Sequence, residues 1–269
     1  MSAPVGGGDA TTGAGDARET VIRLADVHKG FAGKRVLQGL DLTVRRGESF
    51  VMIGASGSGK SVTLKLVVGL LQPDRGEVWV GQERVDGAPS RTLRQVRGRV
   101  GFLFQSSALI NWLTVAENVA LPLAEHSGLP RQEIERRVDE HLEVVHMLGS
   151  KQQMPSELSG GQKRRVALAR VLAARPSVIL YDEPTAGLDP VMTARIAELI
   201  RTVQRDLGVT SILVTHDLSC AFEAGDRIAM IDGGRVVHED ETEGFRRTEN
   251  PVVRNFLSGG RAAVRGSTP

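Results

Sequence analysis

The sequence predicts an α/β fold in which helices cover a mostly parallel sheet, with a helical insertion in the middle of the chain. Three observations predict it. Short apolar strand segments alternate with helix-like segments, which is the pattern of a sheet covered on both faces. One strand, ESFVMIG, runs straight into a glycine-rich turn that opens a helix. Between roughly 106 and 158, charged and amphipathic helical sequence interrupts the alternation.

Composition narrows the class of protein. The 269 residues are 41% hydrophobic and 25% charged, a balance that allows a globular protein with a substantial core. The formal net charge of +2 and the scattered Lys and Arg residues do not indicate a nucleic-acid partner. The single cysteine, Cys220, excludes an internal disulfide, and its apolar-periodic surroundings predict a buried, unreactive thiol.

The two ends of the chain differ in character from the rest. Residues 1–20 and 258–269 are rich in glycine, alanine and small polar residues, so we expect a disordered leader and a flexible tail around one domain of residues 21–257. The leader lacks the basic and apolar regions of a secretory signal. No run of 18 apolar residues is present to span a bilayer. We therefore expect a cytoplasmic protein, unless a partner holds it at a membrane.

Strand patterns come first in chain order. VIRLADV and LDLTV alternate around the turn AGKR, and ESFVMIG follows them. KSVTLKLVVGLL has helical spacing, whereas GEVWVGQERV and RVGFLFQ return to strand. The insertion contains the helices VAENVALPLAEH and RQEIERRVDEHLEVVHML. The alternation then resumes with helix KRRVALARVLAA, strand PSVILYDEP, helix PVMTARIAELIRTVQRDL, strand SILVTH, helix LSCAFEAG, and the strands RIAMID and RVVHED.

The glycine-rich turn has the spacing G-x-x-x-x-G-K-[ST] of a phosphate-binding loop, from Gly54 to Ser61. Gly57 and Gly59 allow successive backbone N–H groups to point at phosphate oxygens. Lys60 would reach the β- and γ-phosphates, and the Ser61 hydroxyl would bind Mg²⁺. The alternative is a merely flexible loop, but the strand before the turn and the helix after it favour the phosphate loop.

Two acids end the apolar strand VILYD. Asp182 would lie at the carboxyl edge of the sheet, where α/β folds bind ligands, and could hold Mg²⁺ directly or through water. Because adjacent carboxylates repel each other, Glu183 is better placed as the base for an attacking water. A solvated acidic turn is the alternative, and it is the weaker one once the phosphate loop is present.

Three further side chains are candidates for the same site. His216 follows the strand SILVT, and a γ-phosphate contact is favoured over an ordinary polar residue at a strand end. Gln105 ends the strand VGFLF with an amide that could touch both Mg²⁺ and water. Phe31 could stack on a nucleotide base, although a core or turn phenylalanine also fits that position.

A second anion site is predicted a hundred residues later. Ser159, Gly160 and Gly161 form a bare turn before a helix, where backbone N–H groups at the positive helix end can bind an anion. A single nucleotide on a single chain has no need of both sites.

Together these features resemble the ATP-binding cassette (ABC) ATPases, from about Val21 to Leu257. The resemblance implies a P-loop NTPase fold with a mixed sheet core, an antiparallel β subdomain and a helical subdomain at about 106–158. One departure is Ala186, where serine is usual. The matching motifs are the aromatic Phe31, Walker A (Gly54 to Ser61), the glutamine-loop Gln105, the LSGGQ signature (Leu158 to Gln162), Walker B Asp182 with Glu183, the D-loop (Ala186 to Pro190) and the switch His216.

The cofactors that the resemblance implies are ATP and Mg²⁺. The implied roles are catalysis by Glu183, His216 and Gln105; nucleotide binding by Phe31, Gly54, Ala55, Ser56, Gly57, Ser58, Gly59, Lys60, Ser61, Ser159, Gly160, Gly161, Gln162 and Asp189; and Mg²⁺ binding by Ser61, Gln105 and Asp182.

The resemblance also implies partners. Two copies would pack head to tail, so that each ATP lies between one chain's Walker A loop and the other chain's signature. The dimer would drive an integral membrane permease from the cytoplasmic face of the inner membrane. The stretches FQSSAL, PLAEHSGLP, MPSELSGGQ and NPVVRNFLSG resemble the ATPases of Mla/Mce-type systems. That resemblance implies phospholipid or other lipid transport with an Mce-domain lipid-binding protein and a STAS-domain protein.

Other classes of cassette ATPase are alternatives to a lipid transporter. Cassettes for amino-acid transport or lipoprotein release differ at few positions of the same surface. A cassette acting on DNA or ribosomes would usually show a coiled-coil insertion or a second cassette, and neither is visible. A cassette that regulates a membrane complex without transporting anything would have the same motifs.

Overall fold

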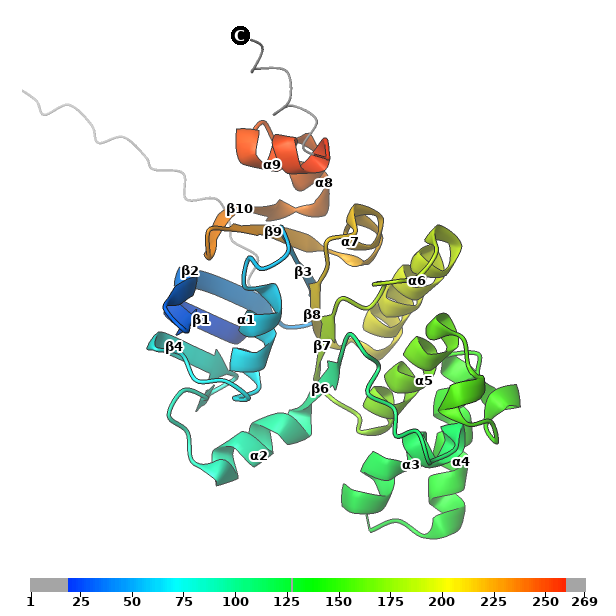
Figure 1. The fold of residues 1–269 in the computed structure, drawn as a ribbon. Helices are drawn as coiled ribbons and strands as arrows, with labels where there is room; N and C mark the ends of the chain where they lie inside the picture. The colour runs from blue at the N-terminus through cyan, green and yellow to red at the C-terminus, as the bar shows by residue number, and fades with distance from the viewer. Residues whose placement is uncertain (1–18, 127, 260–269) are drawn as a thin grey trace, which may run out of the picture.

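The computed structural model describes residues 19–126 and 128–259. Two sheets lie on either side of helix α1, and a group of helices lies at the opposite side of the larger sheet (Figure 1). The expected leader of residues 1–20 lies outside the described residues except for 19 and 20. The expected tail of 258–269 lies outside them except for 258 and 259.

The larger sheet has six strands in the order β10-β9-β3-β8-β7-β6. Strands β9, β3, β8, β7 and β6 run parallel, and β10 pairs antiparallel with β9 at the edge. Every residue of β3, β7 and β8 is buried, as expected for apolar strands covered on both faces. The strands are β3 (Ser49–Ile53), β6 (Val100–Leu103), β7 (Val178–Asp182), β8 (Thr210–Val214), β9 (Arg227–Asp232) and β10 (Arg235–Glu241).

The smaller sheet is antiparallel, with the order β2-β1-β4-β5. The segment GEVWVGQERV, expected as one strand, is a hairpin that turns at Gly81, which has φ of 60°. The strands are β1 (Thr20–Phe31), β2 (Lys34–Arg45), β4 (Arg75–Val80) and β5 (Glu83–Arg84).

Two apolar cores lie on the two faces of the larger sheet. On β3, Phe50 and Met52 point to the core shared with α1 and the smaller sheet, whereas Val51 and Ile53 point to the core shared with α5, α6 and α7. The helices are α1 (Lys60–Val67), α2 (Ser90–Arg99), α3 (Val115–His126), α4 (Arg131–Val144), α5 (Gly160–Ala173), α6 (Pro190–Leu207), α7 (Leu218–Ala224), α8 (Thr242–Arg247) and α9 (Pro251–Leu257).

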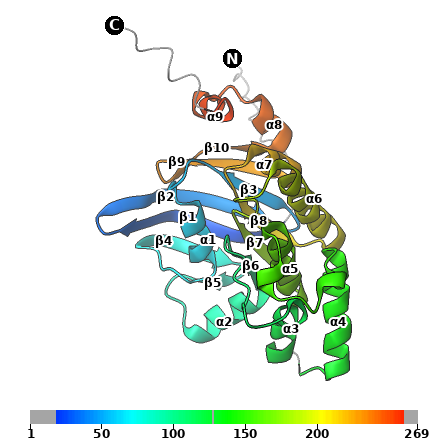
Figure 2. The same cartoon turned by 45° about the vertical axis from the view of Figure 1, so that its right-hand side comes forward.

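The helical insertion is built from α3 and α4, which pack on α5 away from the smaller sheet (Figure 2). Two short 3₁₀ turns, Leu148–Ser150 and Pro155–Glu157, connect α4 to α5. At the other end of the large sheet, α8 and α9 lie beyond β10 in both views (Figures 1 and 2). Within the described ranges, no helix is both long and apolar enough to cross a membrane.

The observed architecture confirms the predicted fold class. The α/β core, the antiparallel β subdomain and the helical subdomain are all present. Sequence analysis did not predict α2, α8 or α9. Helix α2 has only Leu93 and Val96 as apolar residues, too few for a recognisable helical period.

Candidate nucleotide-binding site

The glycine-rich loop connects β3 to α1. Gly54 has φ of 152°, and a Cβ atom there would lie 2.3 Å from the carbonyl oxygen of Ile231 on β9, so only glycine fits. Gly59 precedes α1 with φ of 105°. Helix α1 therefore begins at Lys60 and aims its positive end at the loop, where phosphate oxygens would lie.

Lys60 is the buried cation of this loop. Its Nζ donates to the carbonyl oxygens of Gly54 and Ala55, at 2.8 and 3.1 Å. Burial lowers the pKa of Lys60, and the nearby carboxylates of Glu183 and Asp182 oppose that shift. The ammonium group is thus held by two carbonyl oxygens of the loop, at the position where a triphosphate would need a cation.

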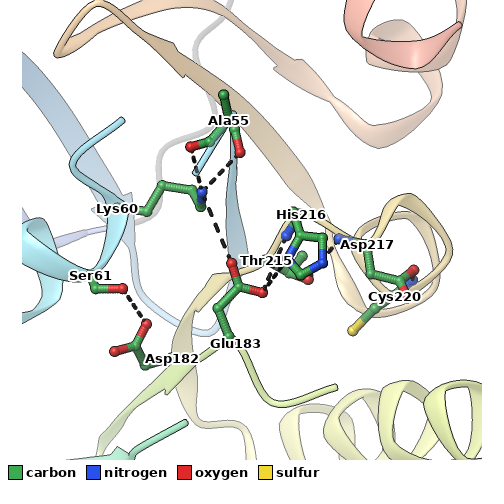
Figure 3. A network of polar contacts seen from close by, with 10 residues as sticks. Ala55, Lys60, Ser61, Asp182, Glu183, Thr215, His216, Asp217 and Cys220 are labelled. Atoms are coloured by element: carbon green, nitrogen blue, oxygen red, sulfur yellow. Dashed lines mark hydrogen bonds and ion pairs between the residues drawn. The ribbon is translucent and has the colours of Figure 1, made fainter. Parts of the chain in front are cut away.

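Two oxygen ligands suited to Mg²⁺ meet across the sheet edge. The Ser61 hydroxyl at the start of α1 donates to Asp182 Oδ1 at the end of β7, over 2.6 Å (Figure 3). Hydroxyl and carboxylate oxygens fit Mg²⁺, which takes its remaining ligands from phosphates and water. Among the described residues, no group of three or more His, Cys, Asp and Glu side chains could hold a metal ion.

Glu183 and His216 form the next contact on this edge. Glu183 Oε2 lies 2.8 Å from His216 Nδ1, and Oε1 lies 4.0 Å from Lys60 Nζ (Figure 3). Glu183 has φ of 48°, a left-handed conformation that is uncommon for glutamate and is often seen at functional sites. Its carboxylate is thereby turned to face the phosphate loop, where it can accept a proton.

A cavity of about 670 Å³ joins these groups. Phe31 lies at its edge with 41% of its surface exposed, and Lys29 Nζ is 5.4 Å from the ring centroid. Three lining residues were not predicted from the sequence, namely Lys34, Val36 and Val62, although the basic turn AGKR next to Phe31 was a signal for Lys34. The lining residues are Phe31, Lys34, Val36, Ser56, Gly57, Gly59, Lys60, Ser61, Val62, Gln105, Glu183 and His216.

The predicted second anion site is not part of this cavity. Ser159 caps α5, with its Oγ accepting from Gln162 N at 3.3 Å and its own N–H donating to Gln162 Oε1 at 2.8 Å. Ser159 and Gly160 are exposed. Asp189 caps α6 by accepting from the backbone N–H groups of its first turn, and it too lies away from the cavity. These predicted nucleotide contacts are therefore not brought together with Lys60 in one chain.

Fold and site together define a P-loop domain built to bind a nucleoside triphosphate. The family model described as ABC transporter matches residues 37–186. The methionine import ATP-binding protein MetN of Rhizobium etli is 41% identical over 90% of this chain and 67% of its own length. The MetN protein of Carboxydothermus hydrogenoformans is 41% identical over 88% of this chain and 72% of its own length.

Solved structures agree with this match. The dimeric ATP-binding cassette MJ0796, bound to ADP and Pi, is 33% identical over 82% of this chain and 98% of its own, with a TM-score of 0.75. The CbiO1 structure from Clostridium perfringens, part of the transporter complex CbiONQ, is 28% identical over 90% and 97%, with a TM-score of 0.79. The chain belongs to the ABC transporter family, and it is an ATPase.

The comparisons correct one part of the sequence interpretation. The relatives above are named as methionine importers, so they do not support the Mla/Mce resemblance, nor the Mce-domain and STAS-domain partners that it implied. They favour the amino-acid alternative that the sequence analysis left open. The lipid interpretation rested on four short stretches of the sequence, whereas the match to the methionine importers covers about nine tenths of the chain.

Proposed function

We propose that this ATPase works as a head-to-tail dimer that encloses two ATP molecules. The observation that carries the proposal is the exposed turn at Ser159 and Gly160, an anion site at the start of α5 that lies outside the chain's own cavity. A second copy of the chain would place the phosphates of its bound ATP at this turn. The dimeric cassette MJ0796 supports the same arrangement for this chain.

The chain's own residues would drive hydrolysis as follows. Glu183 accepts the proton of a water molecule that attacks the γ-phosphorus, and ADP leaves with the electron pair of the broken P–O bond. His216 contacts the γ-phosphate and orients Glu183 through their 2.8 Å contact. Lys60 balances charge on the β- and γ-phosphates. Ser61, Asp182 and Gln105 would hold Mg²⁺, which would supply positive charge beside the phosphates.

The dimer would transmit this cycle to a membrane permease, with the ATPase on the cytoplasmic face of the membrane. A groove of about 630 Å³ between α2 and the helical subdomain supports such docking. Its apolar lining and its arginines suit an amphipathic helix that carries acidic residues. The groove includes Leu93, Arg94, Arg97, Pro122, Arg137 and Arg175.

Amino-acid import is our first candidate for the transport function, because the relatives are named as methionine import proteins. Lipid transport with Mce-domain and STAS-domain partners is the second candidate, on the specific observation of the stretches FQSSAL and PLAEHSGLP. Both candidates share the ATP cycle and differ only in the permease and its cargo.

Co-purification tests the proposal. Tagged Glu183→Gln protein is extracted from its source cells in mild detergent with ATP and Mg²⁺, and its partners are identified by mass spectrometry. We expect to recover a permease together with an amino-acid-binding protein. We also expect methionine to raise the ATPase activity of the wild-type complex. An Mce-domain protein with phospholipid would replace the first candidate with the second. Recovery of no membrane protein would overturn the transport proposal.

Arg94→Glu should release the permease without changing basal ATPase activity.

A further inference from the structure

Two arginines of α5 hold the loop that begins with Gln105. Arg164 Nη1 donates to the carbonyl oxygens of Phe104 and Gln105, at 2.8 and 2.5 Å. These carbonyls directly follow β6. Helix α5, which follows the signature turn, is therefore joined to the glutamine loop by contacts between a side chain and the backbone, about sixty residues apart in sequence.

The second arginine extends this contact along the loop. Arg170 Nη1 donates to the carbonyl oxygen of Ala108 at 2.9 Å, and Nη2 donates to that of Ser107 at 3.2 Å. Hence two arginines of one helix hold four carbonyls within five consecutive residues, 104–108. We call Arg164 and Arg170 with these four carbonyls the arginine clamp.

The clamp holds a loop with an unusual backbone. Ser107 and Ala108 have φ of 62° and 47°, so two successive residues other than glycine are left-handed. Such residues persist only where surrounding contacts fix them. Arg170 binds the carbonyls of both, and Ser107 N donates to Phe104 O at 2.9 Å. The path of the loop after Gln105 thus depends on where α5 lies.

Arg164 contacts Gln105 and interacts electrostatically with Asp182, two residues of the predicted ATP site. It is 5% exposed, and burial lowers the pKa of its guanidinium, which the charge of Asp182 opposes. Its Nε is buried and has no hydrogen-bond partner among residues 19–126 and 128–259. A buried arginine with two strong contacts and one unmet donor can change partners when its neighbours shift. Gln105, whose carbonyl it binds, lines the nucleotide cavity.

We propose that Arg164 is a positioning residue that links Gln105 to the signature turn of the same chain. When Gln105 turns toward Mg²⁺ and the γ-phosphate, the backbone that Arg164 holds moves with α5, whose exposed start at Ser159 and Gly160 faces the partner's ATP in the proposed dimer. Filling one site therefore positions the donors of the other site. The inference rests on the proposed head-to-tail dimer and adds a route by which the two sites cooperate.

Kinetics of Arg164→Gln and Arg164→Lys test the proposal. Without Mg²⁺, we expect the nucleotide affinity of Arg164→Gln to lie within about threefold of the wild-type affinity, because the phosphate loop is unchanged. We expect kcat to fall about tenfold and the Hill coefficient for ATP to fall toward one, as lost coupling between sites requires. Arg164→Lys keeps the charge and should give an intermediate kcat. Hydrogen exchange of the amides in 104–109 should be faster in both variants.

The control is Arg131→Gln, which removes an exposed arginine of α4 that pairs with Glu135. It should keep the wild-type kcat and Hill coefficient. If thermal melting shows that Arg164→Gln does not fold, the Hill coefficient of Arg164→Lys tests the proposal instead. Wild-type kcat and Hill coefficient in the folded Arg164 variants would overturn the proposal, as would a loss of affinity as large as the loss of kcat. A wild-type protein without cooperativity would instead count against the proposed dimer.

Discussion

Replacing Glu183 by glutamine removes one carboxylate and changes little else in size or shape. The carboxylate lies 2.8 Å from His216 Nδ1 and 4.0 Å from Lys60 Nζ, at the end of β7. An amide cannot take a proton from water at neutral pH. The variant should therefore bind ATP normally and hydrolyse it poorly.

The size of both effects follows from the contacts. A positioned general base contributes about 10²–10⁴ in rate, which is roughly 3–5 kcal/mol of barrier. Opposite charges 4 Å apart attract by about 4 kcal/mol at an effective dielectric constant near 20. That lost attraction to Lys60 is offset when ATP binds, because phosphates then face the cation and one repelling carboxylate is gone. Nucleotide affinity should be equal or higher in the variant.

Phosphate release at saturating ATP and Mg²⁺ measures the first effect, and a fluorescent-nucleotide titration measures the second. Size-exclusion chromatography with ATP should also show a stable dimer of Glu183→Gln. Glu198→Gln is the matched control, since Glu198 is an exposed residue of α6. Turnover of Glu183→Gln within threefold of the Glu198→Gln control would refute the assignment of the base.

Four further predictions concern binding and stability. Lys60→Ala should weaken ATP binding about tenfold or more, since it removes a charge-assisted contact; an unchanged Kd would contradict the phosphate-loop assignment. Gly54→Ala should cost about 3 kcal/mol in denaturant unfolding because its Cβ meets Ile231, and a smaller cost would show that the loop can shift. The Cys220 thiol, whose pKa burial raises to about 12, should resist alkylation until the protein is unfolded. Arg227→Met should lower the free energy of unfolding by about 1–3 kcal/mol, because the buried Glu48 carboxylate loses the guanidinium 3.2 Å away and keeps the backbone N–H of Arg45. Adding Glu48→Leu should recover part of that loss; additive losses would exclude a coupled pair.

Features with strong local signals could be predicted from the sequence. The runs VILYD and SILVT are short, apolar and followed by polar residues, and they form the fully buried strands β7 and β8. The spacing from Gly54 to Ser61 placed a loop between a strand and a helix, as observed. Because parallel strands end at one edge, Asp182 could be expected beside Ser61, and the two side chains meet at 2.6 Å.

Features that depend on contacts between distant segments could not be predicted. Lys34 and Val36 reach the nucleotide cavity only because the hairpin of β1 and β2 packs on the phosphate loop, where a Cβ atom built at Gly59 would lie 3.3 Å from Val36 O. The arginine clamp likewise requires β6 to end beside α5. An arginine in a basic helical run, such as Arg164 between Lys163 and Arg165, is predicted from the sequence as a solvated residue.

The stretch FQSSAL and the relatives indicate different cargoes. FQSSAL resembles lipid-transport ATPases, whereas the relatives are named as methionine importers.

Mixing two inactive variants tests the central claim most directly. Lys60→Ala disables the phosphate loop, and Ser159→Arg blocks the signature turn, so each protein alone should be inactive. In a head-to-tail dimer of the two, one site carries both changes and the other carries neither. An equal mixture should therefore recover up to about a quarter of wild-type ATPase activity, because half of the dimers are mixed and each has one intact site. A mixture of folded variants as inactive as its components would contradict the claim that two chains share each ATP.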